Sequence, residues 1–305
     1  MTNDQRPTTS DRSCGTYRLL DTGHERRLEE VGPLRVVRQG LAALWPPRLP
    51  AAEWDRADAV HHRSDKGGGR WEWRTGEPRE FAIAYGGSRF RIRLTDFGHL
   101  GLFPEQAENW DWLRRTLRAM GGSEPPKVLN LFAYTGGSTL AASQGGAAVV
   151  HVDAARGVVD WARENARLSG VADRPIRWIV DDALKFVRRE GRRGNRYQGI
   201  VLDPPTFGRG PKGQVFKIEE HLFELLEACA AILAPGPAFV LLSCHTPGFT
   251  PTTLANLLEA AIPRAADRME RGEMLVTDET GRALPSGTYA RWVAGVRGQR
   301  AEERS

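Results

Sequence analysis

The fold class follows from one segment, KVLNLFAYTGG, which runs from Lys127 to Gly137. Its first half, Lys127–Phe132, is a short apolar run that predicts a buried strand. The two glycines at its end let the backbone approach a ligand closely, and a helix can begin at Gly136. A plain strand-to-helix turn remains the alternative, because a glycine pair alone is weak evidence. The segment contains no G-x-G-x-x-G pattern, which excludes the usual nicotinamide dinucleotide fingerprint.

Strand and helix patterns alternate on the carboxyl side of this segment. The predicted strands are Lys127–Phe132, Ala147–Val152, Ile176–Val180, Gly199–Leu202, Ala238–Leu242, Met274–Val276 and Tyr289–Ala294. The predicted helices are Gly136–Ala142, Gly157–Leu168, Ala183–Arg189, Ile218–Leu233 and Thr252–Ile262. Continuous apolar strands that alternate with helices predict an α/β fold, in which helices cover both faces of a parallel sheet. The last two strands are joined without a helix, which predicts an antiparallel hairpin at the sheet edge.

The amino-terminal part of the chain has a different pattern. We expect a disordered polar tail over residues 1–15, a β-rich region with a linking helix over 16–120, and the α/β domain over 121–305. Phe81–Tyr85 and Phe90–Leu94 flank a glycine pair and predict a hairpin. Tryptophans are dense here, and we interpret them as core residues of a small β-rich unit.

Composition excludes several classes of protein. The 305 residues are 40% hydrophobic, and no run of 18 apolar residues predicts a membrane span. The amino-terminal residues lack the apolar region of a secretory signal, so we expect a cytoplasmic protein. Three cysteines are too few for a disulfide framework or a zinc site, and we expect no metal. The net charge of +5 permits a nucleic-acid partner without requiring one, and the sequence leaves the oligomeric state open.

One basic cluster interrupts this even charge distribution. Its members are Lys185, Arg188, Arg189, Arg192, Arg193 and Arg196. A solvated helix end explains it, since basic side chains suit the negative pole of a helix dipole. Contact with phosphates is the alternative.

Acidic residues end two neighbouring predicted strands. Ligands in an open α/β sheet bind outside the carboxyl ends of its strands. Asp153 ends the second strand, where a carboxylate can accept hydrogen bonds from both hydroxyls of a ribose. Asp181 and Asp182 end the third, where one of them can receive the amine of an adenine. Capping of the following helices is the alternative for all three.

The fourth and fifth predicted strands end in different chemistry. Asp203-Pro204-Pro205-Thr206-Phe207 follows the fourth, and its two prolines predict a rigid extended loop that can present carbonyls and an aromatic ring to a planar substrate. Ser243 and Cys244 end the fifth. We expect Cys229, inside an apolar helix, to be a core residue, and Cys14 to lie in the tail.

Together these motifs resemble S-adenosylmethionine-dependent class I methyltransferases with a Rossmann-like sheet of seven strands. The similarity is strongest to the family of bacterial 23S ribosomal RNA methyltransferases that includes cytosine-5 enzymes, and it covers roughly residues 90–300. It extends to Gly101-Leu-Phe-Pro-Glu-Gln106, which is similar to a family segment that helps to close over the cofactor.

The resemblance assigns residues to roles. It implies S-adenosylmethionine as the cofactor and RNA as the partner. The residues that it implies for binding the cofactor are Phe132, Tyr134, Thr135, Gly136, Asp153, Asp182 and Asp203. Those that it implies for the substrate are Pro204, Pro205 and Phe207, with Asp203 and Cys244 as the catalytic pair. In cytosine-5 members a cysteine at the position of Cys244 attacks C6 of the pyrimidine, which makes C5 nucleophilic.

Three functions remain open on the sequence. Methylation of an RNA base, most simply cytosine C5 of 23S ribosomal RNA, is the first. The second is methylation of a nitrogen or oxygen in another base or a small molecule, with Cys244 a buried apolar residue. The third is a binding protein without catalysis. His245 follows Cys244 directly, and successive strand side chains point to opposite faces, so it is poorly placed to activate that thiol.

Overall fold

The computed structural model describes residues 15–64, 68–77, 80–211, 213–263, 265 and 269–294. The expected disordered tail, residues 1–15, therefore lies outside the described residues except for Gly15, and so does Cys14.

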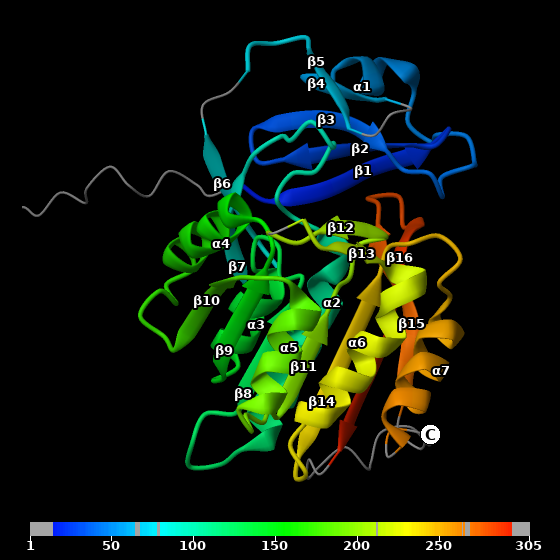
Figure 1. Ribbon diagram of the computed structural model, residues 1–305. Coiled ribbons are helices and arrows are strands. Elements are labelled where there is room, and N and C mark those ends of the chain that lie inside the picture. The colour runs from blue at the N-terminus through cyan, green and yellow to red at the C-terminus, as the bar shows by residue number, and fades with distance from the viewer. Residues whose placement is uncertain are drawn as a thin grey trace, which may run out of the picture.

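A seven-stranded sheet forms the larger part of the structure (Figure 1). Its strands are β8 (Lys127–Leu131), β9 (Ala148–Asp153), β10 (Ile176–Val180), β11 (Gly199–Leu202), β14 (Ala238–Cys244), β15 (Met269–Thr277) and β16 (Ala283–Ala294). Their order is β10-β9-β8-β11-β14-β16-β15. The first five are parallel, whereas β16 runs antiparallel to both of its neighbours. The predicted Rossmann-like sheet, with an antiparallel hairpin at its edge, is confirmed.

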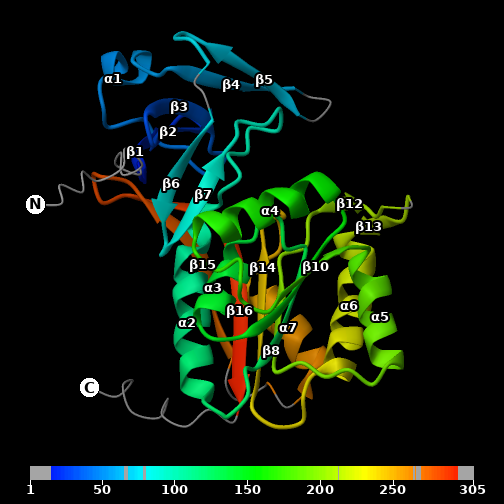
Figure 2. The same ribbon diagram turned by 90° about the vertical axis from the view of Figure 1, so that its left-hand side faces the viewer.

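Helices cover both faces of this sheet (Figure 2). They are α2 (Ala107–Met120), α3 (Gly137–Gln144), α4 (Arg156–Leu168), α5 (Ala183–Arg192), α6 (Ile218–Ile232) and α7 (Pro251–Ala261). Residues of α2, α3 and α4 share one buried cluster, and residues of α5, α6 and α7 share another. Strand side chains alternate between the two: Val201 joins the first, whereas Ile200 and Leu202 join the second. This is why the strands are apolar throughout.

A second, smaller sheet precedes the seven-stranded sheet in the chain. It contains β1 (Tyr17–Gly23), β2 (Arg26–Val31), β3 (Leu34–Gln39), β4 (Ala59–Arg63) and β5 (Gly69–Trp73) in that order, with helix α1 (Ala51–Asp55) against it. The hairpin of β6 (Phe81–Tyr85) and β7 (Ser88–Ile92) follows, as predicted. Backbone N–H groups of β7 donate to the side chains of Asn165 in α4 and of Ser169, which follows that helix. The β-rich amino-terminal region is therefore confirmed.

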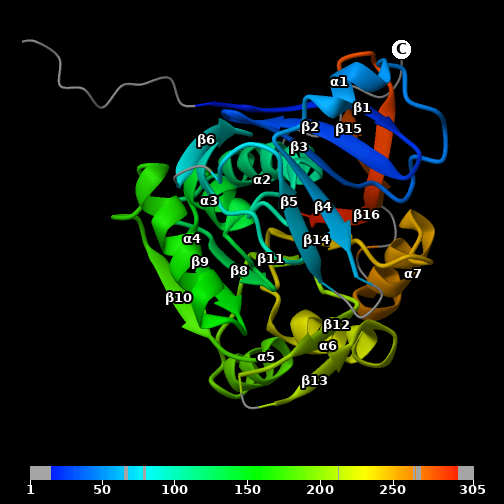
Figure 3. The same ribbon diagram turned by 90° about the horizontal axis from the view of Figure 1, so that it is seen from above.

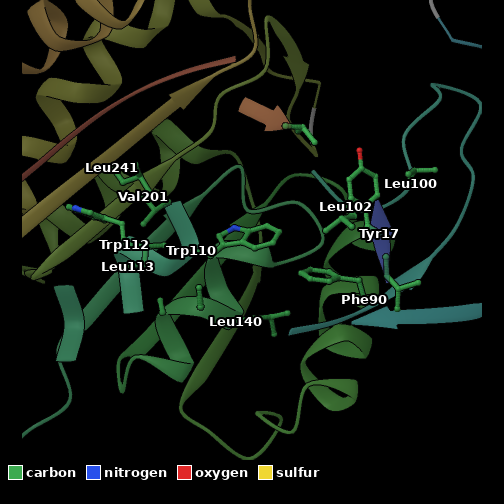
Figure 4. Close-up of a cluster of buried hydrophobic side chains, with 14 of the residues drawn as sticks. Tyr17, Phe90, Leu100, Leu102, Trp110, Trp112, Leu113, Leu140, Val201 and Leu241 are labelled. Atoms are coloured by element: carbon green, nitrogen blue, oxygen red, sulfur yellow. The ribbon is translucent and has the colours of Figure 1, made fainter. Parts of the chain in front are cut away.

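The two parts share a hydrophobic core (Figure 4). Tyr17 of β1 and Phe90 of β7 belong to the same buried cluster as Trp110 and Trp112 of α2 and Val201 of β11. Trp110 and Trp112 are each only 3% exposed, so the interpretation of the tryptophans as core residues holds for them. The boundary at residues 120 and 121 stays a prediction, because this core crosses it.

Candidate active site

A cavity of about 870 Å³ lies between the carboxyl edge of the seven-stranded sheet and the amino-terminal sheet. Seen from above, strands of the amino-terminal sheet cross over that edge (Figure 3). The predicted site residues that line it are Phe132, Tyr134, Asp153, Asp182, Asp203, Pro204, Pro205 and Cys244. Thr135, Gly136 and Phe207 do not line it.

The loop after β8 has an unusual backbone. Phe132 and Tyr134 have φ angles of 53° and 47°, and Gly136 has a φ of 92°. Left-handed conformations are costly for residues with a side chain and cluster at functional sites. They place the Phe132 and Tyr134 side chains at the cavity wall, where the Tyr134 ring lies 5.3 Å from that of Phe103. The loop thus forms a fixed wall of the cavity.

Thr135 and Gly136 support this loop from behind. The Thr135 hydroxyl, 2% exposed, donates to the carbonyl of Gly101 at 2.7 Å and so fastens the segment before α2. A side chain at Gly136 would meet the Cβ of Ala162 at 3.2 Å, so glycine here permits close packing of α4. Thr135 and Gly136 therefore hold the cavity wall in place without lining the cavity themselves.

Asp153 ends β9 beside this loop. Its Oδ2 accepts from the backbone N–H of Tyr134 at 2.9 Å, and its Oδ1 from that of Ala155 at 2.9 Å. Burial raises the pKa of this carboxyl, and the backbone N–H groups of Ala155 and Tyr134 oppose that shift. A carboxylate can accept about four hydrogen bonds, so Asp153, which lines the cavity, retains acceptor capacity. Two acceptors held in this way fit the paired hydroxyls of a ribose.

Asp181 and Asp182 have different roles at the end of β10. Asp181 pairs with the guanidinium of Arg189 at 2.6 Å. Asp182 caps α5 by accepting from the backbone N–H of Lys185 at 2.9 Å through Oδ1. Both line the cavity. Because Asp181 already has a cationic partner, Asp182 is the better acceptor for an adenine amine.

Asp203 directly follows β11 and lines the cavity. It accepts from the Gln106 amide at 3.1 Å and lies 3.3 Å from the His245 Nδ1. The other ring nitrogen of His245 lies 3.2 Å from a Glu105 carboxylate oxygen. Two carboxylates therefore flank the ring, one hydrogen-bonded to Nε2 and the other at ion-pair distance from Nδ1, and both favour the protonated imidazole.

The pKa values of these three groups agree with this pairing. Burial opposes the charged form of His245, but the Asp203 and Glu105 carboxylates outweigh it and raise the pKa of the imidazole well above its usual value. Burial also opposes ionisation of Asp203 and Glu105. The neighbouring His245 outweighs this effect, so the pKa of each carboxyl is lowered.

Cys244 ends β14, next to β11, and its side chain is 1% exposed. Its sulfur accepts from the backbone N–H of Thr246 at 3.4 Å. Burial raises the pKa of the thiol, and the Thr246 N–H opposes this. His245 pairs with carboxylates rather than with this sulfur, but it follows the last residue of β14, so the strand alternation used in the sequence analysis does not apply to it. Cys229 is a buried core residue, as predicted.

The loop after Asp203 leads into a short hairpin that the sequence analysis did not predict. Its strands are β12 (Phe207–Arg209) and β13 (Val215–Lys217). Pro204 is buried and Pro205 exposed, and the Thr206 hydroxyl lies 2.8 Å from that of Thr246. Phe207 is 51% exposed and has the Arg209 guanidinium 5.8 Å from its ring. Phe207 thus lies outside the cavity, on the surface beside it.

Sequence reasoning missed the contribution of the amino-terminal sheet. Arg27 of β2, Arg63 of β4 and the stretch 39–42 after β3 line the cavity, and Arg209 lines it from β12. Nothing local in the sequence marks these residues, because only the docking of the two sheets brings them there.

The basic cluster on α5 is largely neutralised. Asp181 pairs with Lys185 and Arg189, Glu224 with Arg188, and Glu190 with Arg193. Arg196 lines a separate cavity together with Lys127, at the start of β8. These contacts fit the interpretation of a solvated helix end.

Neither a metal site nor a membrane-spanning helix is found in the described part of the chain. No group of three or more His, Cys, Asp or Glu residues is placed to hold a metal ion there. No described helix combines the length and apolar character needed to cross a bilayer.

Known proteins with similar sequences are methyltransferases. Residues 9–275 match the S-adenosylmethionine-dependent methyltransferase family. The ribosomal RNA large subunit methyltransferase K/L of Pseudomonas paraeruginosa is 32% identical over 198 residues, which are 64% of this chain and 26% of that protein. The ribosomal RNA large subunit methyltransferase I of Aeromonas hydrophila is 29% identical over 209 residues, 67% of this chain and 50% of that protein. This chain therefore spans half or less of these relatives.

One solved structure matches nearly the whole chain. The S-adenosylmethionine-dependent methyltransferase of Agrobacterium tumefaciens is 37% identical, has a TM-score of 0.83, and is matched over 92% of this chain and 90% of its own. The strand order, the acceptors at the ends of β9 and β10, and the family match agree. The chain belongs to the S-adenosylmethionine-dependent methyltransferase family.

Proposed function

We propose that this chain transfers the methyl group of S-adenosylmethionine to a base of RNA, with ribosomal RNA in the cytoplasm as the favoured substrate. One observation carries the proposal: a single cavity holds the nucleoside-binding strand ends, the Asp203-Pro204-Pro205 loop and two arginines from outside the seven-stranded sheet, Arg63 and Arg209. Guanidinium groups that line such a cavity suit the phosphates that flank a target nucleotide. The names of the relatives support the same substrate class.

At the donor end of the cavity, residues of this chain bind and orient the cofactor. The cofactor, when bound, supplies an electrophilic methyl group. We assign the ribose to Asp153 and the adenine amine to Asp182, since both carboxylates line the cavity with free acceptor capacity. The wall of Phe132 and Tyr134 is assigned to the methionine part.

At the acceptor end, the fixed loop after β11 positions the base. Proline locks the backbone on both sides of Pro204, so the loop carbonyls keep their direction. The ring of Phe216, 5.0 Å from that of Phe132, also lines the cavity and gives a planar base an aromatic neighbour.

The finer form of the proposal is methylation of cytosine C5 with Cys244 as the nucleophile. The thiol proton leaves to solvent, and the sulfur bonds to C6 of the ring. The electrons of the C5–C6 double bond then form the bond from C5 to the methyl carbon, which breaks the bond from that carbon to the cofactor sulfur and leaves S-adenosylhomocysteine. Loss of the C5 proton to solvent and of the Cys244 sulfur as a thiolate restores the double bond. Cys244 lines the cavity at the end of the strand next to Asp203, as this chemistry requires.

A nitrogen or oxygen acceptor is the second candidate, and one observation favours it. The Cys244 thiol is almost fully buried with a raised pKa, and the nearby imidazolium is already paired with two carboxylates. A ring nitrogen needs no thiolate, because its lone pair attacks the methyl carbon directly.

Tritiated methyl transfer to total RNA, followed by nucleoside analysis, tests the main proposal. We expect label in one modified nucleoside of ribosomal RNA from cells that lack this protein. Label in no RNA, together with intact cofactor binding, would contradict the RNA assignment and point to a small-molecule acceptor.

Arg63 and Arg209 offer an independent test of RNA contact. Arg63→Ala and Arg209→Ala should each lower the slope of log affinity against log salt by about 0.7–0.9. The exposed Arg115 of α2 lies outside the cavity lining, so Arg115→Ala is the matched control. Slopes equal to the control would remove these arginines from the RNA contact.

Substitutions of the two buried cysteines distinguish a cytosine C5 acceptor from a nitrogen or oxygen acceptor. On the C5 mechanism, Cys244→Ala loses methylation by several orders of magnitude, roughly 10³-fold or more, because C5 is no longer activated. Cys229→Ala, which alters an equally buried thiol in the core, is the control. RNA that contains 5-fluorocytosine should trap the unmodified protein in a complex stable to denaturing gels. Normal turnover by Cys244→Ala would instead assign a nitrogen or oxygen acceptor.

A further inference from the structure

Two charged side chains from outside the seven-stranded sheet line the same cavity and are incompletely paired. Arg27 comes from β2 of the amino-terminal sheet, and Glu105 from the 3₁₀ turn Pro104–Gln106 that precedes α2. No role in the site described above uses the free atoms of either residue.

Arg27 carries a largely unneutralised charge. Its side chain is 16% exposed, and its buried Nε has no hydrogen-bond partner among the described residues. The carboxylate paired with it is Glu29, at 3.7 Å. Glu29, however, is already bound by the Arg38 guanidinium at 2.5 and 2.6 Å and by the Tyr17 hydroxyl at 2.8 Å. A buried guanidinium in this state has capacity for one more anion.

Glu105 is the acidic counterpart. One of its oxygens pairs with His245, while the other, Oε2, is buried without a hydrogen-bond partner among the described residues. Glu105 and Asp203 together carry two negative charges against the single positive charge of His245. The group therefore has an excess of one negative charge and suits one further cation. Leaving such an oxygen unpaired in the interior is costly.

The two free valences are opposite in charge and belong to side chains that line the same cavity. The charge of Arg27 is one of the causes that lower the pKa of Glu105. A ligand with a carboxylate and an ammonium on neighbouring atoms would satisfy both. The amino-acid end of the methionine part of the cofactor has these two groups.

We propose that Arg27 and Glu105 form the receptor for this amino-acid end: the guanidinium of Arg27 binds the α-carboxylate, and Oε2 of Glu105 accepts from the α-ammonium. The amino-terminal sheet then contributes directly to cofactor affinity. This assignment concerns the cofactor and holds whether or not the acceptor is RNA.

Calorimetric titration with three ligands tests it without any turnover. S-adenosylhomocysteine has both groups, its decarboxylated analogue keeps only the amine, and methylthioadenosine has neither. Arg27→Met should weaken S-adenosylhomocysteine by about 10- to 100-fold while changing the other two by about twofold or less. Glu105→Gln should weaken the two amine-containing ligands and spare methylthioadenosine.

Two neighbouring residues give matched controls. Arg26→Met changes the adjacent residue of β2, which contacts Trp54 and does not line the cavity. Glu108→Gln changes an exposed residue of α2 that pairs with Arg291. Both controls should bind all three ligands as the unmodified protein does, and thermal unfolding midpoints report whether each variant folds.

Three outcomes overturn the assignment. Equal weakening of all three ligands would mean that Arg27 and Glu105 only shape the cavity. Unchanged affinity for S-adenosylhomocysteine would remove them from the cofactor site. Unchanged affinity for it together with weaker RNA binding by Arg27→Met would make the anion a phosphate. Glu105→Asp keeps the charge, and its affinity should lie between those of Glu105→Gln and the unmodified protein.

Discussion

The two halves of the cavity hold their carboxylates in different ways. In the donor half, Asp153 is fixed by backbone N–H groups of its own loop and of the neighbouring strand's loop. In the acceptor half, Asp203 is fixed by side chains, Gln106 from before α2 and His245 from directly after β14. Backbone donors form with the sheet itself, whereas the side-chain contacts require the segment before α2 to dock. The donor half is therefore built by the sheet, and the acceptor half by tertiary assembly.

The largest expected effect lies in the donor half. Asp153→Ala should remove both ribose contacts and lower the binding free energy of S-adenosylhomocysteine by about 2–4 kcal/mol, since the hydroxyls stay buried. Calorimetry measures it. An unchanged affinity in a folded variant would place the ribose elsewhere and undo the comparison.

Gly101 tests the segment that joins the two halves. Its φ is 80°, and a Cβ there would lie 1.9 Å from the Trp161 ring. Gly101→Ala should therefore shift this segment and lower the free energy of unfolding by about 1–3 kcal/mol. Gly157→Ala is the control, because a Cβ at Gly157 meets nothing within 4 Å. Urea unfolding distinguishes them, and equal stabilities would show that the segment moves freely.

In the acceptor half, His245 should make stability depend on pH. The pKa of His245 is raised in the folded protein, so its stabilising effect is complete below the unfolded pKa of about 6.5 and is lost as the pH rises through the folded value. The difference in unfolding free energy between the unmodified protein and His245→Gln should therefore be larger at about pH 6 than at about pH 10. A difference that does not change with pH would mean that His245 is neutral.

The smallest effect is expected far from both halves. The helix α5 begins at the cavity with its cap Asp182 and extends about 15 Å over its ten residues, so Arg192 lies at the opposite end. Arg192→Ala and Arg196→Ala should leave the salt dependence of RNA binding unchanged. A slope reduced by about 0.7–0.9 for either would return this cluster to the RNA contact.

The sequence predicted what local patterns determine. Strands β10 and β11 were placed at their observed bounds, since short apolar runs between turn residues are a local signal. β15 was predicted as Met274–Val276 but extends over Met269–Thr277, because its outer residues are polar and gain their pairing from β16. The hairpin of β12 and β13 was missed, since three-residue strands carry no period.

The site residues likewise divide into those that a local sequence pattern locates and those that only tertiary packing brings to the cavity. The acids at the strand ends could be located from sequence because each follows an apolar run. The ion pairs of His245 could not, since Glu105 lies 140 residues earlier in the chain. Arg27 carries no motif at all, and only the docking of the amino-terminal sheet brings it to the cavity. Cys244 was located, but its burial depends on packing that no spacing reveals.

Contacts from β1 and from the stretch after β3 to the turn between β15 and β16 can form only after most of the chain has been synthesised. Arg48 donates to Thr280 over a separation of 232 residues, and Arg282 to the Thr22 carbonyl over 260. The amino-terminal sheet leaves the ribosome long before these partners exist, and domains generally fold as units while the chain emerges. The part of this region that contacts the turn therefore stays uncovered until Glu279 to Arg282 has been translated. Closing loops of this length is slow, so completion of the cavity is a late event in folding.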